Sequence, residues 1–276
     1  MVELTPKEIQ LLLLNVMTDI DKFCTENDIS YYMIGGTLLG AVRHQGFIPW
    51  DDDIDIAMLR SDYNKFIKMW KPEAHANYVL QNTYTDPKCC HTITRILVKG
   101  TKLVHNGSYN VTAEHSELFF DIFPLDNVPD TEEARNTQRK ELLNIKRKIG
   151  YKFSKTKSSN AIKQVMKEIR RVLLMPVSYR SLINELNCVA QRFNGQATHC
   201  ICSMSSQYDY NKQAMDRSIY GTPVRMKFED RCFLAPAQSD AYLNHLYGDY
   251  MKLPPKEKQV FNIRVMAEEG LKDRLQ

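Results

Sequence analysis

The segment from residue 34 to residue 56, IGGTLLGAVRHQGFIPWDDDIDI, constrains the fold more than any other part of the chain. A two-glycine turn, Gly35-Gly36, opens a short apolar helix, and an acidic strand of alternating polarity follows after a loop. Because side chains on a strand alternate between its two faces, Asp53 and Asp55 point the same way, while the isoleucines that follow them point into the core. The segment therefore predicts a turn, a helix and a strand that bring two carboxylates close to a helix N-terminus.

Two adjacent carboxylates repel each other, and one of them stays protonated unless a cation lies between them. A divalent metal ion is the usual counter-charge, and oxygen ligands without a nearby His or Cys favour Mg²⁺ or Mn²⁺. Glycine N–H groups at a helix start, facing a metal ion held by Asp53 and Asp55, describe a site for a phosphate ester. The alternative for these two aspartates is an exposed acidic loop in front of a strand.

A third acid, Asp121, lies in the otherwise apolar stretch ELFFDIFPLD. On a strand it shares a face with Phe119 and Phe123, where an unpaired carboxylate would cost several kcal/mol. The predicted metal site would supply the missing partner, and an ion pair with an arginine such as Arg95 is the structural alternative. Asp121 is therefore the candidate third carboxylate of the site.

The order of the expected elements favours an α/β (α+β) fold with a mixed β-sheet and flanking helices. A capping box at Thr5, with proline at the first helical position, starts a helix that runs to about Asn27. We expect a core over residues 1–130 and a mostly helical C-terminal region over residues 131–276. The expected strands are 29–34, 53–58, 78–81, 92–98 and 117–123, and the expected later helices are 131–153, 160–175, 178–193 and 239–247.

The glycine turn, the paired acids and the third acid together resemble the nucleotidyltransferase fold of the DNA polymerase β superfamily. GGTLLGAVRHQGFIPWDDDIDIAM, followed by SDYNKF, resembles the LicD family of phosphocholine transferases, to which fukutin and fukutin-related protein are also similar. FFDIFPLD and YGDYMKLPP are similar to later motifs of that family. Many members of the wider superfamily have serine after the first glycine, whereas this chain has Gly36 and then Thr37, a feature that the LicD-like branch shares.

The resemblance implies that Asp53 and Asp55 are metal ligands, with Mg²⁺ as the cofactor and Mn²⁺ as a substitute. It also implies that Asp121 is either a third metal ligand or the base for an attacking hydroxyl. Asp51 and Asp52 are acidic neighbours that would tune the site, and the resemblance supports them less as ligands.

The substrate-binding residues that the resemblance implies lie around the turn. Gly35 and Gly36, followed by Thr37, would form the phosphate-binding turn. Arg43 would contact a bridging pyrophosphate, because its planar fork suits phosphate oxygens, and a structural ion pair is the alternative for it. Trp50, next to the acidic run, is a further candidate.

The implied reaction is transfer of phosphocholine from CDP-choline to a sugar hydroxyl of a bacterial cell-surface glycan precursor, such as a teichoic acid or lipopolysaccharide unit, with release of CMP. Residues 131–276 would complete the acceptor side. The alternatives are transfer of another phospho-alcohol such as phosphoribitol, nucleotidyl transfer, and a metal-dependent glycan- or membrane-binding protein without turnover. Aromatic faces usually recognise a quaternary ammonium head, and the candidates are Tyr31, Tyr32, Trp50, Tyr84, Tyr109 and Phe119.

The net charge of +4 is unevenly distributed. Residues 135–180 contain fourteen Lys or Arg and two Glu, a balance of +12, so the rest of the chain carries −8. Such asymmetry indicates an anionic partner. Part of this segment predicts a helix with one apolar stripe, made of Ile162, Val165, Met166, Ile169, Val172 and Leu173.

This basic helix has three interpretations. The simplest is a helix packed on the core with a solvated basic face. The second is a basic amphipathic surface that contacts an anionic membrane or a phosphate-rich, lipid-linked acceptor. Nucleic-acid binding is the weakest, because no nucleic-acid-binding module accompanies the charge, and we expect no nucleic-acid partner.

We expect a cytoplasmic protein, with residues 135–180 as a candidate peripheral contact at the inner face of the membrane. No apolar run approaches the ~20 residues that cross a bilayer, and the N-terminus has no signal-peptide pattern. Seven cysteines without a disulfide framework indicate a reducing compartment. The runs 199–202 (HCIC) and 89–91 (CCH) lack the spacing of a zinc knuckle, so thiols without a metal are expected there.

Overall fold

The N-terminal helix begins where the sequence predicts. In the computed structural model, α1 spans Pro6–Glu26. The N–H of Thr5 donates to the Glu8 carboxylate at 2.7 Å, and the N–H of Glu8 donates to the Thr5 hydroxyl at 3.3 Å, which confirms the capping box. The structure describes residues 1–71, 73, 75–86, 89, 91–104, 117–153, 160–206 and 208–272.

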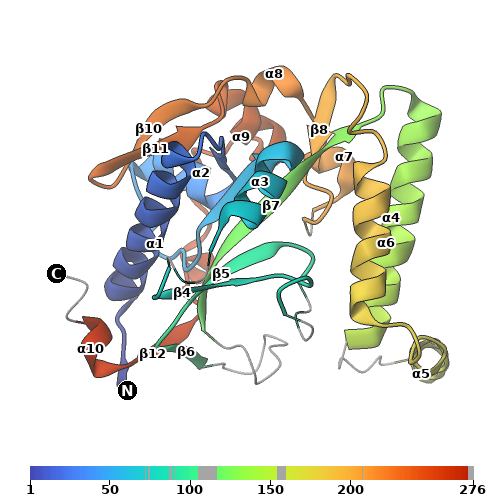
Figure 1. Ribbon diagram of the computed structural model, residues 1–276, viewed down its shortest axis with the longest axis horizontal. Helices are drawn as coiled ribbons and strands as arrows, with labels where there is room; N and C mark the ends of the chain where they lie inside the picture. The colour runs from blue at the N-terminus through green and yellow to red at the C-terminus, as the bar shows by residue number, and fades with distance from the viewer. Residues whose placement is uncertain are drawn as a thin grey trace.

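A mixed, seven-stranded sheet forms the centre of the molecule and confirms the expected α/β class (Figure 1). Strand β3 runs parallel to β7, and the other neighbouring pairs are antiparallel. The order is β2 (Tyr32–Met33), β3 (Asp55–Leu59), β7 (Leu118–Val128), β5 (Thr94–Val98) and β4 (Tyr78–Gln81), while β8 (Cys200–Cys202) pairs with β7 and β9 (Met215–Asp216). The strand expected over 29–34 is shorter in the structure, because only two of its residues join the ladder with β3.

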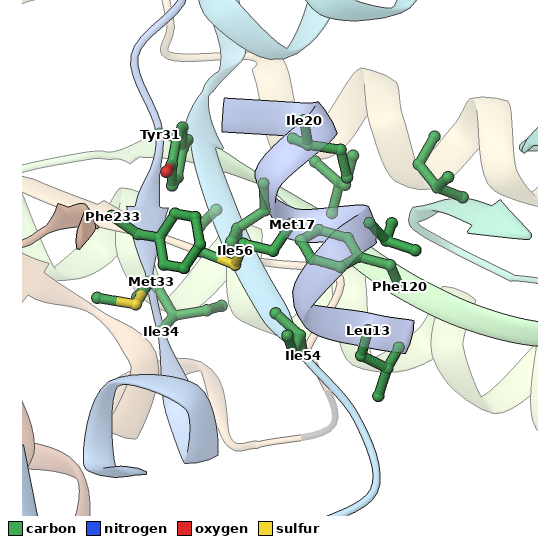
Figure 2. Close-up of a cluster of buried hydrophobic side chains, with 14 of the residues drawn as sticks. Leu13, Met17, Ile20, Tyr31, Met33, Ile34, Ile54, Ile56, Phe120 and Phe233 are labelled. Carbon is green, nitrogen blue, oxygen red and sulfur yellow. The ribbon is translucent and has the colours of Figure 1, made fainter. Parts of the chain in front are cut away.

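Helix α1 covers one face of this sheet. Ile56 and Phe120 are fully buried, and Figure 2 shows both beside Met17 of α1. Because neighbouring residues on a strand point to opposite faces, Asp55 and Asp121 point to the sheet face that α1 does not cover. Burial of the apolar face therefore determines where the acidic side chains lie.

The chain returns to this core after residue 214. Helix α9 (Ser239–Tyr247) has the bounds expected from the sequence, and its Tyr242 and Leu243 belong to the same hydrophobic cluster as α1. The N-terminal and C-terminal strands also share a small antiparallel sheet, so residues far apart in the sequence stabilise one core. The remaining elements of this part are β1 (Val2–Glu3), α2 (Gly35–His44), α3 (Arg60–Met69), β6 (Thr101–Val104), α8 (Arg217–Tyr220), β10 (Val224–Phe228), β11 (Arg231–Ala235), η2 (Lys256–Lys258), β12 (Arg264–Ala267) and α10 (Glu269–Lys272).

Two long helices lie side by side at one end of the sheet (Figure 1). They are α4 (Glu132–Phe153) and α6 (Tyr179–Gln191), close to the expected bounds. Leu142 and Ile145 of α4 and Leu186 of α6 form a second hydrophobic cluster with Val128 at the end of β7. The short helix α7 (Tyr210–Gln213) completes this cluster through Tyr210.

Helix α5 (Ala161–Leu173) forms where the sequence predicts, but the expectation that it packs on the core is wrong. None of its residues is buried, and the six side chains of its apolar stripe are 48–73% exposed. The hydrophobic periodicity identifies an apolar face correctly, but it does not identify what covers that face. Figure 1 shows α5 at the end of the α4–α6 pair, away from the sheet. Across the described residues, no helix combines the length and apolar character needed to span a bilayer.

Candidate active site

The pairing of three strands brings the candidate carboxylates together. Asp55 on β3 lies directly opposite Asp121 on β7, and Arg95 on β5 lies opposite Asp121 on its other side. The N–H of Asp121 donates to the carbonyl of Ile54 at 3.1 Å, which extends the β3–β7 ladder towards Asp53. A row of charged side chains therefore crosses the sheet on the face opposite α1.

The glycine turn lies against these acids. Gly35 has φ +57°, a conformation that side-chain-bearing residues rarely adopt, and a Cβ there would lie 3.4 Å from Oδ2 of Asp55. A Cβ on Gly36 would lie 2.8 Å from Oδ2 of Asp51. A side chain at Gly35 would therefore strain the backbone, and one at Gly36 would displace the Asp51 carboxylate. The hydroxyl of Thr37 accepts a hydrogen bond from the N–H of Asp55 at 2.9 Å, which holds α2 against β3.

The acidic run is more compact than its sequence suggests. Carboxylate oxygens of Asp51, Asp52 and Asp53 lie within 4.8 Å of one another, and among the described residues they are the one group of three or more acids, histidines or cysteines with this spacing. The carboxylate of Asp52 also accepts a hydrogen bond from the N–H of Asn262 at 3.0 Å. Asp51 and Asp52, which the resemblance supports less as ligands, therefore belong to the same acidic group as Asp53.

Burial and mutual repulsion raise the pKa values of this group. Burial, followed by the charge of Asp51, raises the pKa of Asp53 to about 8. Burial and the charge of Asp52 raise the pKa of Asp51 to about 7. Burial and then the charge of Asp53 raise the pKa of Asp55. A cation among these carboxylates would favour their charged forms and oppose every one of these shifts.

Arg95 partly neutralises the row. Its Nε donates to Oδ1 of Asp121 at 2.8 Å, and its guanidinium lies 3.8 Å from the ring centre of Phe119. Burial raises the pKa of Asp121 even though Arg95 lowers it. The ion pair considered as the structural alternative for Asp121 is thus present, and it coexists with the acidic group because Arg95 offers one positive charge to several carboxylates.

Arg43 and Trp50 flank the acids. Nη1 of Arg43 donates to the carbonyl of Tyr250 at 2.7 Å. Burial lowers the pKa of Arg43, and the charge of Asp51 opposes that shift. Trp50 is half-buried, with its ring edge-on to His44 at 6.0 Å between centroids. Both side chains therefore come from the loop and the helix that border the acidic run.

The aromatic candidates separate into two groups. Tyr31 and Tyr32 are core residues, because both are buried and their hydroxyls donate to the Asp21 carboxylate and the Gly221 carbonyl. Tyr84 lies in a cavity between α3 and α6, apart from the acids. Trp50 directly precedes the acidic run in the chain, and the Phe119 ring lies under Arg95, the partner of Asp121. Tyr109 falls outside the described residues.

The structure adds two tyrosines that the sequence analysis missed. The hydroxyl of Tyr242 accepts a hydrogen bond from the N–H of Gly35 at 3.3 Å, and the hydroxyl of Tyr247 would lie 3.8 Å from a Cβ on Gly35. Burial raises the pKa of both phenols. The motif YGDYMKLPP contained the signal for Tyr247, but the sequence did not indicate that it reaches the glycine turn.

The cysteine runs form no metal centre among the described residues. Nδ1 of His199 contacts the Asp130 carboxylate at 2.9 Å, and buried Cys202 donates its thiol hydrogen to the carbonyl of Tyr210 at 3.7 Å. Cys89 is a buried free thiol, while Cys90 lies outside the described residues.

Comparison with known proteins supports the resemblance. Residues 28–158 match the model of a family described as LicD/FKTN/FKRP, nucleotidyltransferase domain. The chain is 30% identical over 266 residues to the lipopolysaccharide cholinephosphotransferase LicD of Haemophilus influenzae, which covers 94% of this chain and 96% of that protein. It is also 52% identical over 52 residues to an uncharacterised protein of Rickettsia prowazekii, covering 19% of this chain and 20% of that protein. The chain therefore belongs to the LicD family and is an enzyme of the phosphotransferase type.

Proposed function

We propose that this enzyme transfers phosphocholine from CDP-choline to a sugar hydroxyl of a bacterial cell-surface glycan precursor and releases CMP. The observation that carries the proposal is the close approach of the Gly35-Gly36 turn to the carboxylates of Asp51 and Asp55, which leaves little room for a Cβ at Gly36. A helix N-terminus against a group of acids suits a phosphate ester bound together with a cation. The relative's name supports phosphocholine as the group transferred and a lipopolysaccharide unit as the acceptor, with a teichoic acid as the alternative glycan.

Mg²⁺ fits the site, because its preferred ligands are carboxylate oxygens and because a cation would offset the burial and mutual repulsion that raise the pKa values of Asp53 and Asp55. Asp53 and Asp55, with Asp121, would hold the ion, and Mn²⁺ has the same ligand preference. When bound, the ion would neutralise the pyrophosphate and polarise the transferred phosphoryl group. The acidic neighbours Asp51 and Asp52 would make the electrostatic potential at the ion more negative.

The protein's own groups would orient the reactants. N–H groups at the start of α2 would donate to the donor phosphates, and Arg43 would exchange its contact with the Tyr250 carbonyl for a phosphate oxygen. Arg95 would keep Asp121 charged and correctly oriented, so that this carboxylate can accept the proton of the attacking hydroxyl. Most of the rate enhancement would come from positioning and charge stabilisation, as in other phosphoryl transfers.

The C-terminal region would complete the acceptor side. Tyr242 and Tyr247 reach the glycine turn, and the backbone of Asn262 contacts Asp52. We therefore assign residues 1–130 to the catalytic core and residues 131–276 to completing the site.

The choline head would meet aromatic faces at the edge of the acidic group, and Trp50 and Phe119 are the candidates. CDP-choline use implies a cytoplasmic location with access to the inner face of the membrane.

The first experiment is calorimetric titration of CDP-choline, CDP-ribitol, CTP and ATP into the purified protein, with and without Mg²⁺. We expect Mg²⁺-dependent binding of CDP-choline in preference to the other three, weakened in Asp53→Asn. Preference for CDP-ribitol would make the enzyme a phosphoribitol transferase, and preference for CTP or ATP would make it a nucleotidyltransferase. If no donor binds and Asp53→Asn changes nothing, the protein is a metal-dependent glycan- or membrane-binding protein instead.

A further inference from the structure

Helix α5 presents a continuous apolar face to solvent. At 100° per residue, the six apolar side chains of its stripe cover an arc of about 120° on one side of the helix. Their exposed fractions run from 48% at Met166 to 73% at Ile162. Met175, just beyond the helix, is also 70% exposed. A monomeric soluble protein rarely leaves such a contiguous patch uncovered.

The basic residues of α5 lie on the opposite side of the helix. Lys163, Lys167, Arg170 and Arg171 occupy the arc outside the stripe, and Glu168 is the one acid among residues 161–173. This division into a basic face and an apolar face is typical of helices that lie in the plane of a membrane interface. Neighbouring α4 adds Lys152 at the same end of the molecule, whereas Lys148 of α4 pairs with Glu185 at 3.0 Å.

The helix is held in this orientation by its C-terminal end. Nζ of Lys152 on α4 donates to the carbonyl of Leu174 at 2.9 Å and to that of Val177. Arg170 hydrogen-bonds to the hydroxyl of Tyr151 on α4 and lies over its ring, 5.0 Å from the centre. These contacts use the basic side of α5 and its C-terminal turn, so the apolar stripe stays free to face away from the protein.

We propose that α5 is a membrane-docking helix that inserts its apolar stripe into the interface of an anionic bilayer while its basic residues contact the lipid phosphates. The excess of +12 over residues 135–180 is complementary to such a surface. A second copy of this chain, packed stripe against stripe, would bring two segments of charge +12 close together and is disfavoured by their repulsion. The proposal does not depend on which donor the enzyme uses.

Vesicle co-sedimentation with the full chain tests the proposal. We expect binding to phosphatidylglycerol vesicles, weak binding to phosphatidylcholine vesicles, and loss of binding as salt is raised. Ile162→Asn combined with Ile169→Asn should weaken binding by about tenfold or more, since the stripe loses two anchors. The matched control is Leu11→Asn combined with Val79→Asn, two exposed apolar residues elsewhere, and it should bind like the parent.

A second pair of variants tests the electrostatic part. Lys163→Gln combined with Lys167→Gln should weaken binding by roughly 30-fold, because each basic residue near an anionic surface contributes about 1 kcal/mol. Lys7→Gln combined with Lys102→Gln removes the same charge from the body of the protein and should have little effect. If both pairs weaken binding equally, the attraction comes from net charge alone and the assignment to α5 is wrong.

Tryptophan fluorescence tests which face inserts. Ile169→Trp should show a blue shift with phosphatidylglycerol vesicles, whereas Lys167→Trp, on the basic face, should not. Equal shifts or no shift in both variants would overturn the proposal. A dimer would also overturn the proposal. In that outcome the parent sediments as a dimer, the variant with Ile162→Asn and Ile169→Asn sediments as a monomer, and neither protein binds vesicles. A second copy of the chain would then cover the stripe.

Discussion

Strand β7 carries two buried aspartates whose surroundings differ. Asp126 has a complete set of partners: Arg60 donates to its two oxygens at 2.8 and 2.6 Å, and Asn194 donates at 2.7 Å. Asp121 also meets an arginine, but it faces Asp55 across the ladder, and its charge raises the pKa values of Asp53 and Asp55.

The difference separates a fully paired acid, Asp126, from Asp121, the acid that we propose to be catalytic. Asp126, whose charge is fully compensated, joins α3 to β7 through Arg60 and joins β7 to the segment after α6 through Asn194. A buried acid that repels its neighbours destabilises the metal-free fold, and it is retained where a cation or substrate supplies the missing charge. The same substitution should therefore have opposite consequences at the two positions.

Asp126→Asn should have the largest effect, on stability. It leaves the guanidinium of Arg60 buried without its counter-charge, so we expect the free energy of unfolding to fall by about 3–5 kcal/mol. Urea denaturation monitored by circular dichroism measures this. Asp130→Asn, at an exposed aspartate paired with His199, is the control and should leave the denaturation midpoint nearly unchanged. A stable Asp126→Asn protein would show that Arg60 finds another partner.

Asp121→Asn should instead lower the rate of phosphocholine transfer by about 10²–10³-fold. Its free energy of unfolding should change by less than about 1 kcal/mol, because relief of repulsion with Asp55 offsets the weaker contact with Arg95. The measurement is a steady-state assay of CMP release alongside the same urea denaturation. A large loss of stability with full activity would assign Asp121 to structure, like Asp126.

Gly36→Ala should have a smaller effect on activity. The new Cβ would lie 2.8 Å from Oδ2 of Asp51, so the Asp51 carboxylate must shift away from the helix N-terminus. We expect CMP release to slow by about 10–100-fold, since displacements of about 1 Å at a reacting centre have effects of this size. Gly195→Ala, where nothing lies within 4 Å of the added Cβ, should retain parental activity. Equal activity in both variants would mean that the turn does not need this close approach.

The last prediction concerns the pH dependence of stability. The pKa of Asp51 is raised from 3.8 to about 7 and that of Asp53 from 3.8 to about 8, so the folded, metal-free protein binds more protons than the unfolded chain over that range. Its stability should fall as pH rises from about 4 to about 8. In EDTA, the Tm should fall as pH rises, by roughly 2–4 °C for each kcal/mol of unfolding free energy that is lost. Mg²⁺ should restore the Tm most at the alkaline end of the range. Asp53→Asn should flatten the profile, and an equally steep profile in that variant would exclude Asp53 as the titrating group.

The sequence by itself determined the local features of this protein. The capping box at Thr5, the bounds of α9 and the helical periodicity of α5 depend on residues a few positions apart. The Gly35-Gly36 turn, Asp53 and Asp55 also lie within one short segment, and their motif was specific enough to indicate the family.

Tertiary structure decided which distant residues meet. Only strand pairing brings Arg95 next to Asp121, and only the return of the C-terminal region brings Tyr242 to the N–H of Gly35. The fate of α5 was also undetermined, because periodicity defines an apolar face while neighbouring elements decide whether it is covered. Local pattern follows from backbone geometry and side-chain chemistry along the chain, whereas burial, ion pairing and the resulting pKa shifts depend on contacts between segments that the linear order does not specify.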